Sequence, residues 1–207
     1  MSSSYLLDPY IINIVERGNS VLDVACGRGK WGHLVNTSHK PPSFIIGVDI
    51  WPQYLKETAK HRIYDDVILC DAKYLPLRDS SFDTVLACEV LEHVEKSEGK
   101  NLLKELERVC RDKIIVSTPK IRFEQDIVEG NAYQIHRSRW SPNELRKHGY
   151  LVRGVGFGLF GASTPPMLIM GLAPLSYYLP ETSYILLAVK ERRHLDSETP
   201  NEETVWK

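Results

Sequence analysis

A glycine-rich turn stands between a short apolar run and a helical pattern near the start of the chain. Residues 21–32 read VLDVACGRGKWG and contain the spacing GxGxxG at Gly27, Gly29 and Gly32. Glycine at these positions allows a tight turn and lets the backbone approach a ligand closely at a helix N-terminus. The pattern therefore predicts a strand, a turn and a helix that open a βαβ unit.

Short apolar runs alternate with helical patterns along the rest of the chain. The runs expected to form strands are 20–25, 44–49, 67–70, 82–88, 113–117, 152–157 and 184–190. Helices are expected after the Asp8–Pro9 pair, which resembles an N-cap followed by proline, and over 30–36, 52–60, 98–109 and 142–147. Such alternation is typical of a parallel sheet that is covered on both faces.

The expected fold class is α/β: a single Rossmann-like domain with a seven-stranded, mostly parallel sheet and helices on both faces. The last strand is expected to be antiparallel, because no clear crossover helix precedes it. With 207 residues, 43% of them apolar and 26% charged, the chain is most simply one ordered domain. We expect this domain over 1–190, with a helix within 1–19 and a polar, flexible tail over 191–207.

The charge balance and the cysteines exclude several classes of protein. The chain has 26 Lys and Arg against 27 Asp and Glu, which argues against broad non-specific binding to nucleic acid. Its four cysteines form no CxxC pair, so neither a zinc knuckle nor a compact disulfide framework is indicated. Scattered thiols and the absence of an evident targeting segment predict a cytoplasmic protein.

Residues 154–180 form an uncharged stretch that is long enough to cross a bilayer. It contains four prolines, which would repeatedly break the hydrogen bonding of a membrane-spanning helix. We expect no transmembrane segment here and interpret 154–182 as an apolar loop or lid. A peripheral membrane contact is the alternative.

Carboxylates accompany the first three expected strands. Asp23 lies inside the first, Asp49 ends the second and Asp71 follows the third. A carboxylate placed like Asp49 can accept hydrogen bonds from both hydroxyls of a ribose. These spacings favour a nucleotide-type ligand. In the alternative interpretation, the glycines only form a turn and Asp49 only caps the next helix.

The ordered set of motifs resembles the class I S-adenosylmethionine-dependent methyltransferases, and most closely their type 11 small-molecule branch. It includes the fourth strand, FDTVLAC at 82–88, and the segment EVLEHV at 89–94 that follows it. The resemblance covers about 21–119 well and 136–190 more loosely. It implies methyl transfer to an O, N or C nucleophile of a small molecule. Trp31 stands where many members have glycine, and we expect it to reshape the pocket near the methionine portion.

The resemblance also implies which residues hold the S-adenosylmethionine. Asp23 would orient its amino group, Asp49 would bind the ribose hydroxyls and Asp71 would accept from the adenine amino group. An acidic site suits this cofactor, which carries cationic groups and no phosphate. The full implied set is Asp23, Ala25, Gly27, Gly29, Asp49, Ile50, Asp71, Ala72 and Cys88.

Two other functions compete with methyl transfer. A short-chain NAD-dependent oxidoreductase would share the glycine turn and the following acid, but the chain lacks the Tyr-x-x-x-Lys expected of one. A non-catalytic module that binds the cofactor or a partner protein fits the same sequence. Methyl transfer to any acceptor distinguishes the enzyme from such a module.

The candidates for catalysis are His93, which follows the fourth strand, and His136. Glu89, Glu92 and His93 form an E-x-x-E-H pattern with which some relatives bind a divalent metal and many others do not. We therefore expect no metal, with these three residues as the alternative ligand set.

The acceptor is expected to be a small molecule, amphiphilic or acidic, and not DNA. The chain lacks the Asp- or Asn-Pro-Pro-aromatic motif of methylases that act on exocyclic amines. Arg137 and Arg139 would favour an acidic acceptor if they face the cleft. The segment 154–182 is expected to form a lid over the acceptor side, opposite the adenosine pocket. Core packing beneath the sheet edge and a homodimer interface are the alternatives for this segment.

Overall fold

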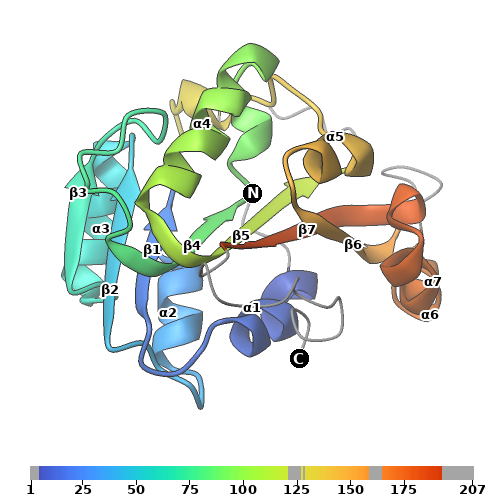
Figure 1. The fold of residues 1–207 in the computed structure, drawn as a ribbon, viewed down its shortest axis with the longest axis horizontal. Coiled ribbons are helices and arrows are strands. Elements are labelled where there is room, and N and C mark those ends of the chain that lie inside the picture. The colour runs from blue at the N-terminus through green and yellow to red at the C-terminus, as the bar shows by residue number, and fades with distance from the viewer. Residues whose placement is uncertain (1–4, 121–126, 128, 159–164, 193–207) are drawn as a thin grey trace.

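A seven-stranded sheet runs through the molecule in the order β3–β2–β1–β4–β5–β7–β6 (Figure 1). The computed structural model describes residues 5–120, 127, 129–158 and 165–192. The strands are β1 (Ser20–Val24), β2 (Phe44–Asp49), β3 (Asp66–Leu69), β4 (Phe82–Cys88), β5 (Cys110–Pro119), β6 (Leu151–Phe157) and β7 (Ser183–Glu191). The strands from β3 to β5 pair in parallel, and β7 pairs antiparallel with both β5 and β6. The predicted fold class is thus confirmed, including the antiparallel last strand.

Helices cover both faces of this sheet. On one face, α1 (Asp8–Ile14), α2 (Lys30–Asn36) and α3 (Pro52–His61) contribute to a single buried apolar cluster. On the other, α4 (Lys96–Val109) and α5 (Pro142–Lys147) contribute to a second. Figure 1 shows α1 and α2 on the opposite side of the sheet from α4 and α5. Burial on both faces explains why the central strands are continuous apolar runs.

The start of α1 differs from the sequence prediction. A 3₁₀ turn, η1 (Tyr5–Leu7), leads directly into the helix, so that Leu7 occupies the N-cap position and Asp8 is already helical. The side chain of Leu7 is fully buried, which fixes the chain ahead of Asp8. The Asp8 carboxylate makes no capping bond and instead lies 2.7 Å from the Lys30 ammonium.

The uncharged stretch forms two short helices, α6 (Pro166–Gly171) and α7 (Ala173–Tyr178), and a 3₁₀ turn, η5 (Pro180–Thr182). The backbone of α7 lies directly on β6, since a Cβ built on Gly154 would come within 2.2 Å of the Ser176 carbonyl oxygen. Figure 1 places both helices beside the β6–β7 end of the sheet. Among the described helices, none is long and apolar enough to cross a bilayer. The expected tail beyond 192, and Phe160 of the expected lid, lie outside the described residues.

The third glycine of the turn motif makes room for an aromatic ring. A Cβ on Gly32 would lie 2.3 Å from Cε1 of Tyr64, whose ring is buried and whose hydroxyl donates to Asp23. We expect Gly32→Ala to lower the free energy of unfolding by about 1–3 kcal/mol, because the anchored ring cannot move away without strain. Urea denaturation measures this effect. Gly171→Ala is the matched control, since no atom lies within 4 Å of its added Cβ, and equal stability of the two variants would contradict the prediction.

Candidate active site

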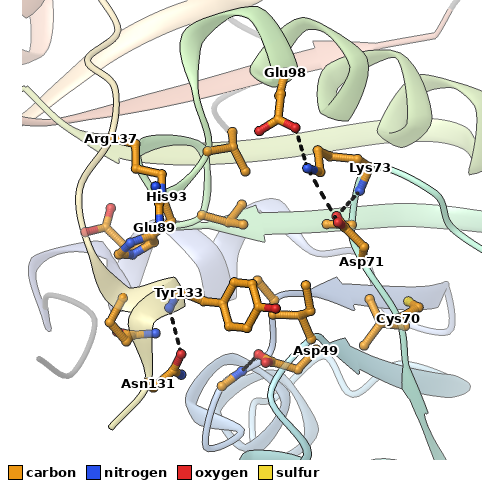
Figure 2. A pocket seen from close by; sticks show the side chains of 18 of the residues that line it. Asp49, Cys70, Asp71, Lys73, Glu89, His93, Glu98, Asn131, Tyr133 and Arg137 are labelled. Atoms are coloured by element: carbon orange, nitrogen blue, oxygen red, sulfur yellow. Dashed lines mark hydrogen bonds and ion pairs between the residues drawn. The ribbon is translucent and has the colours of Figure 1, made fainter. Parts of the chain in front are cut away.

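A cavity of about 250 Å³ opens at the carboxyl ends of the parallel strands, where ligands of open α/β sheets usually bind. Figure 2 shows side chains from β2, from the loop after β3, from the turn after β4 and from the segment before α5 pointing toward it. Its lining residues are Ala25, Gly27, Val48, Asp49, Ile50, Cys70, Asp71, Ala72, Lys73, Glu89, Val90, His93, Val94, Glu95, Glu98, Asn131, Tyr133, Gln134 and Arg137.

The Asp49 carboxylate is fixed at the wall of this cavity. Its Oδ2 accepts a hydrogen bond of 2.8 Å from the Gly27 backbone N–H, and its Oδ1 accepts one of 2.8 Å from the Trp51 N–H. The side chain is largely buried, and burial raises the pKa of Asp49 despite these backbone hydrogen bonds. Each carboxylate oxygen has a second lone pair, so Asp49 can still accept from hydroxyl groups of a ligand.

The backbone adopts left-handed conformations around the cavity. Gly27 and Gly29 have φ of 54° and 84°, as a turn between β1 and α2 requires. Ala25 and Glu89 also have positive φ, 58° and 57°, although they carry side chains. Such conformations are costly for residues with a Cβ and cluster at functional sites. Both residues line the cavity, so two of the five described non-glycine residues with positive φ lie where a ligand would bind.

Ion pairs hold the part of the wall that follows β3. The Lys73 ammonium lies 3.5 Å from the Asp71 carboxylate and 2.6 Å from that of Glu98 on α4 (Figure 2). Asp71 also accepts a hydrogen bond of 2.9 Å from the Lys73 backbone N–H. Among the described residues, five carboxylates and two basic side chains, Lys73 and Arg137, line the cavity. This excess of negative charge suits a ligand that carries positive charge.

Of the nine residues predicted to contact the cofactor, six line the cavity and three do not. Those that line it are Ala25, Gly27, Asp49, Ile50, Asp71 and Ala72; those that do not are Asp23, Gly29 and Cys88. Asp23 is fully buried, and its Oδ2 accepts a hydrogen bond of 2.6 Å from the Tyr64 hydroxyl. Burial raises the pKa of Asp23 to about 7 against the effect of that hydrogen bond. Asp23 is therefore held by Tyr64 outside the cavity lining, and its contact with the cofactor stays a prediction.

Two carboxyl groups follow the end of β4, of which Glu89 is half-buried and Glu92 is buried. Glu89 lines the cavity, and its Oε1 accepts a hydrogen bond of 2.8 Å from the Ser117 hydroxyl. Burial raises the pKa of Glu89 to about 7. Glu92 lies in the 3₁₀ turn η2 (Leu91–His93), where burial and the neighbouring Glu89 raise its pKa well above the ordinary value. The sequence pattern indicated both residues as alternative metal ligands only, although Glu89 also lines the cavity and can contact a ligand there.

The two predicted catalytic histidines lie against each other. Their ring centroids are 4.9 Å apart with the rings edge to face, and only His93 lines the cavity. Burial and the proximity of His136 lower the pKa of His93 to about 4. His93 is thus a weak base at neutral pH, which argues against proton removal as its main role.

One wall of the cavity comes from a segment that the sequence analysis largely missed. The 3₁₀ turn η3 (Ala132–Gln134) brings Tyr133 and Gln134 to the cavity, and Asn131 caps this turn by accepting from the Tyr133 N–H at 2.9 Å (Figure 2). Arg137, predicted as a candidate, also lines the cavity and lies 3.7 Å from the Glu95 carboxylate. The sequence does contain a signal for this turn, the Asn-x-x-Gln spacing after a glycine. That spacing indicates a turn but does not indicate that the turn lies against the cavity.

The lid expected over 154–182 stays a prediction: none of the described residues of this segment lines the cavity, and its described part packs against β6. The expectation for Trp31 differs from the structure. Trp31 is buried in the cluster between α1, α2 and the sheet, away from the cavity lining. The Lys30 ammonium lies 4.3 Å from the centroid of the Trp31 ring. Trp31 therefore fills the core and does not shape the pocket.

Comparison with known proteins agrees with this architecture. Residues 22–116 match a family model described as a methyltransferase domain. Through this segment the chain is similar to methyltransferase domains of that family.

Curated relatives share the same region. The chain is 34% identical over 123 residues to the bifunctional methionine biosynthesis protein MetXA/MetW of Rhodopirellula baltica, covering 56% of this chain and 19% of that protein. It is 32% identical over 95 residues to the tRNA (carboxymethyluridine(34)-5-O)-methyltransferase of Arabidopsis thaliana, covering 45% and 22%. The chain thus spans less than a quarter of the length of these two relatives.

The fold is also found in solved structures. One is a complex between the Haloferax volcanii Trm112 methyltransferase activator and a methyltransferase. Its matching chain has a TM-score of 0.64 at 18% identity, covering 94% of this chain and 91% of that one. At this level of identity the match establishes a shared fold.

Proposed function

We propose that the protein is an S-adenosylmethionine-dependent methyltransferase that acts on an O, N or C nucleophile of a small molecule. The observation that carries this proposal is the buried Asp49 carboxylate, held at the cavity by the Gly27 and Trp51 backbone N–H groups. That geometry presents an acceptor for two vicinal hydroxyls beside a glycine turn, as the ribose of this cofactor requires.

The residues around the cavity fit the rest of the cofactor. Asp71 and Ala72 line the cavity and would face the adenine, and the backbone of Ala25 and Gly27 would contact the methionine portion. The predominantly acidic lining suits a positively charged ligand. When bound, S-adenosylmethionine supplies a methyl group on a cationic sulfonium. The protein's own part is to orient this group and to exclude water around it.

Positioning accounts for most of the catalysis that we propose. Correct placement of two reactants can contribute roughly 7–11 kcal/mol, whereas a general base typically contributes about 10²–10⁴-fold. Glu89 and His93 line the cavity beyond the proposed cofactor path and would contact the acceptor. Arg137 at the same wall supports an acidic acceptor. The expected amphiphilic character has less support, because the described apolar residues of 154–182 lie away from the cavity.

The cellular compartment, the protein partners and the oligomeric state also remain proposals. All four cysteines are free, which supports a reducing compartment such as the cytoplasm. A protein partner is a further proposal, since one structural neighbour is a complex with a methyltransferase activator. Gel filtration with light scattering would distinguish a monomer from the homodimer considered above.

Calorimetry and an activity screen test the proposed function together. We expect the full chain to bind S-adenosylmethionine and to transfer its isotope-labelled methyl group to at least one member of a panel of acidic and amphiphilic metabolites. Tighter binding of NAD than of S-adenosylmethionine would overturn the proposal. Cofactor binding without transfer to any acceptor would favour the non-catalytic module.

A further inference from the structure

Large apolar side chains are exposed on the two short helices beside β6. Six of them form what we call the α6–α7 surface: Met167, Met170, Leu172, Leu175, Tyr178 and Leu179. Six exposed side chains of this size present an apolar area on the order of 500 Å², which is near the upper end of what soluble monomers leave in water. We propose that the α6–α7 surface binds to a lipid bilayer that carries negative charge. This contact is independent of the methyl transfer proposed above.

The exposed residues share one face of each helix. Met167 and Met170 are three positions apart on α6, and Leu175 and Tyr178 are three positions apart on α7. Residues at this spacing lie side by side on a helix. The other face of α7 packs on the sheet, since Ser176 is buried and its backbone lies against β6. The apolar side chains therefore lie on the side of the helices away from β6, where no described part of the chain buries them.

The two helices have the dimensions of an interfacial element. Each has six residues, so each is about 9 Å long and cannot span a bilayer. Helices that lie in the plane of a membrane place their apolar face roughly 5–10 Å into the boundary between head groups and acyl chains. The methionine and leucine side chains of the α6–α7 surface suit that depth. The ring of Tyr178 suits the level of the head groups, because it is apolar and carries a polar hydroxyl.

Basic residues border the α6–α7 surface. The Arg153 guanidinium on β6 lies 4.9 Å from the ring centroid of Tyr177 on α7. Arg146 on α5 lies 3.3 Å from the Glu181 carboxylate in η5. Between residues 145 and 184 the sequence holds three basic residues and one acidic residue, Glu181. The surface is thus apolar at its centre with an excess of positive charge around it, which complements a layer of anionic head groups.

The same charges argue against a second copy of this chain as the occupant. A two-fold contact through the α6–α7 surface would bring together two borders of net positive charge, and like charges across an interface cost affinity. An anionic bilayer turns these charges into an attraction. The ion pair between Arg146 and Glu181 is exposed and contributes little to stability, so Arg146 can pair with a lipid phosphate instead.

The α6–α7 surface is separate from the proposed active site. None of its six residues lines the cavity. The two helices connect the end of β6 to the start of β7, which pairs with the carboxyl end of β5 at Pro119 and Ile185. These strand ends therefore lie at the same edge of the sheet as the cavity (Figure 1). Binding to a bilayer can thus be tested without altering a residue of the cavity.

Co-sedimentation with lipid vesicles tests the proposal. We expect the tag-free full chain to bind vesicles of equal parts phosphatidylglycerol and phosphatidylcholine at least fivefold more tightly than vesicles of phosphatidylcholine alone, and to bind them less tightly as salt is added. Met170→Asp and Leu175→Asp should each weaken binding to the mixed vesicles at least tenfold, because each brings a charge to the level of the acyl chains. Leu69→Asp is the matched control. Leu69 lies on β3 at the other edge of the sheet, is 58% exposed like Met170, and gives a variant of the same net charge.

Circular dichroism and light scattering without vesicles complete the test. The three variants should give the spectrum and the oligomeric state of the parent, since the altered side chains are exposed. Failure of the parent to bind the mixed vesicles, equal binding to both kinds of vesicle, or equal binding by the parent and both α6–α7 variants would overturn the proposal. So would a dimer of the parent that Met170→Asp and Leu175→Asp both dissociate, because a second copy would then occupy the surface. S-adenosylmethionine takes no part in these measurements, so each of these outcomes would leave the proposed methyltransferase function standing.

Discussion

Replacing Asp49 by alanine is expected to weaken the binding of S-adenosylmethionine at least tenfold. The change removes a charge-assisted acceptor for two ribose hydroxyls, and each such hydrogen bond contributes about 1.5–3 kcal/mol. It also leaves the Gly27 and Trp51 N–H groups without their acceptor, which loosens the turn beneath the cofactor. Isothermal titration calorimetry of the parent and of Asp49→Ala measures the difference.

Two further variants make this measurement specific. Asp49→Asn keeps one carbonyl oxygen and loses the charge, so its affinity should fall between those of the parent and of Asp49→Ala. Asp66→Ala removes an exposed carboxylate from β3 and should bind like the parent. If Asp49→Ala binds S-adenosylmethionine as tightly as Asp66→Ala does, the main support for the proposed cofactor site is lost.

The second large effect concerns the pH dependence of stability. Burial raises the pKa of Asp23 from an ordinary value of 3.8 to about 7. The folded chain therefore binds more protons than the unfolded chain between these values, and the free energy of unfolding falls as the pH rises through that range. The full contribution is on the order of 4 kcal/mol. Asp23→Asn has no charge to bury and still offers an oxygen to the Tyr64 hydroxyl.

Urea denaturation of the cofactor-free protein at pH 5 and pH 8 measures this effect. We expect Asp23→Asn to gain stability relative to the parent by about 2–4 kcal/mol between the two pH values. Other groups near Asp23, including Cys26 and Asp49, are present in both proteins, so their titration largely cancels in the comparison. A difference between parent and variant that is the same at both pH values would show that Asp23 is charged throughout.

Local patterns in the sequence were sufficient to predict most of the elements. The ranges of β2, β4 and α2 are the predicted ones, because apolar runs and glycine or proline boundaries define them without help from distant residues. The cap of α5 is also local: Ser141 and Glu144 form the reciprocal bonds of a capping box. The antiparallel last strand followed from the lack of a crossover helix before it, whereas the order of the strands was not predicted.

Features that depend on tertiary packing were not predictable in this way. Leu7 becomes the N-cap of α1 because its side chain is buried, which overrides the local signal of Asp8 and Pro9. The short helices α6 and α7 form in a proline-rich stretch because they pack on β6. The meeting of His136 with Glu92 and His93 depends on a loop that returns to η2, and no spacing in the sequence encodes such a return.

The position of β7 has a consequence for how the chain acquires its structure during synthesis. This strand is the last of the described strands along the chain, yet it lies between β5 and β6 in the sheet. Until residues 183–191 have left the ribosome, β5 presents an open edge of unpaired N–H and C=O groups and β6 has no described neighbour to pair with. A nascent chain in that state is exposed to edge-to-edge association. Completion of the sheet therefore requires the β5–β7 pairing, which has the greatest sequence separation among the described strand pairs, and non-local pairings of this kind generally form slowly.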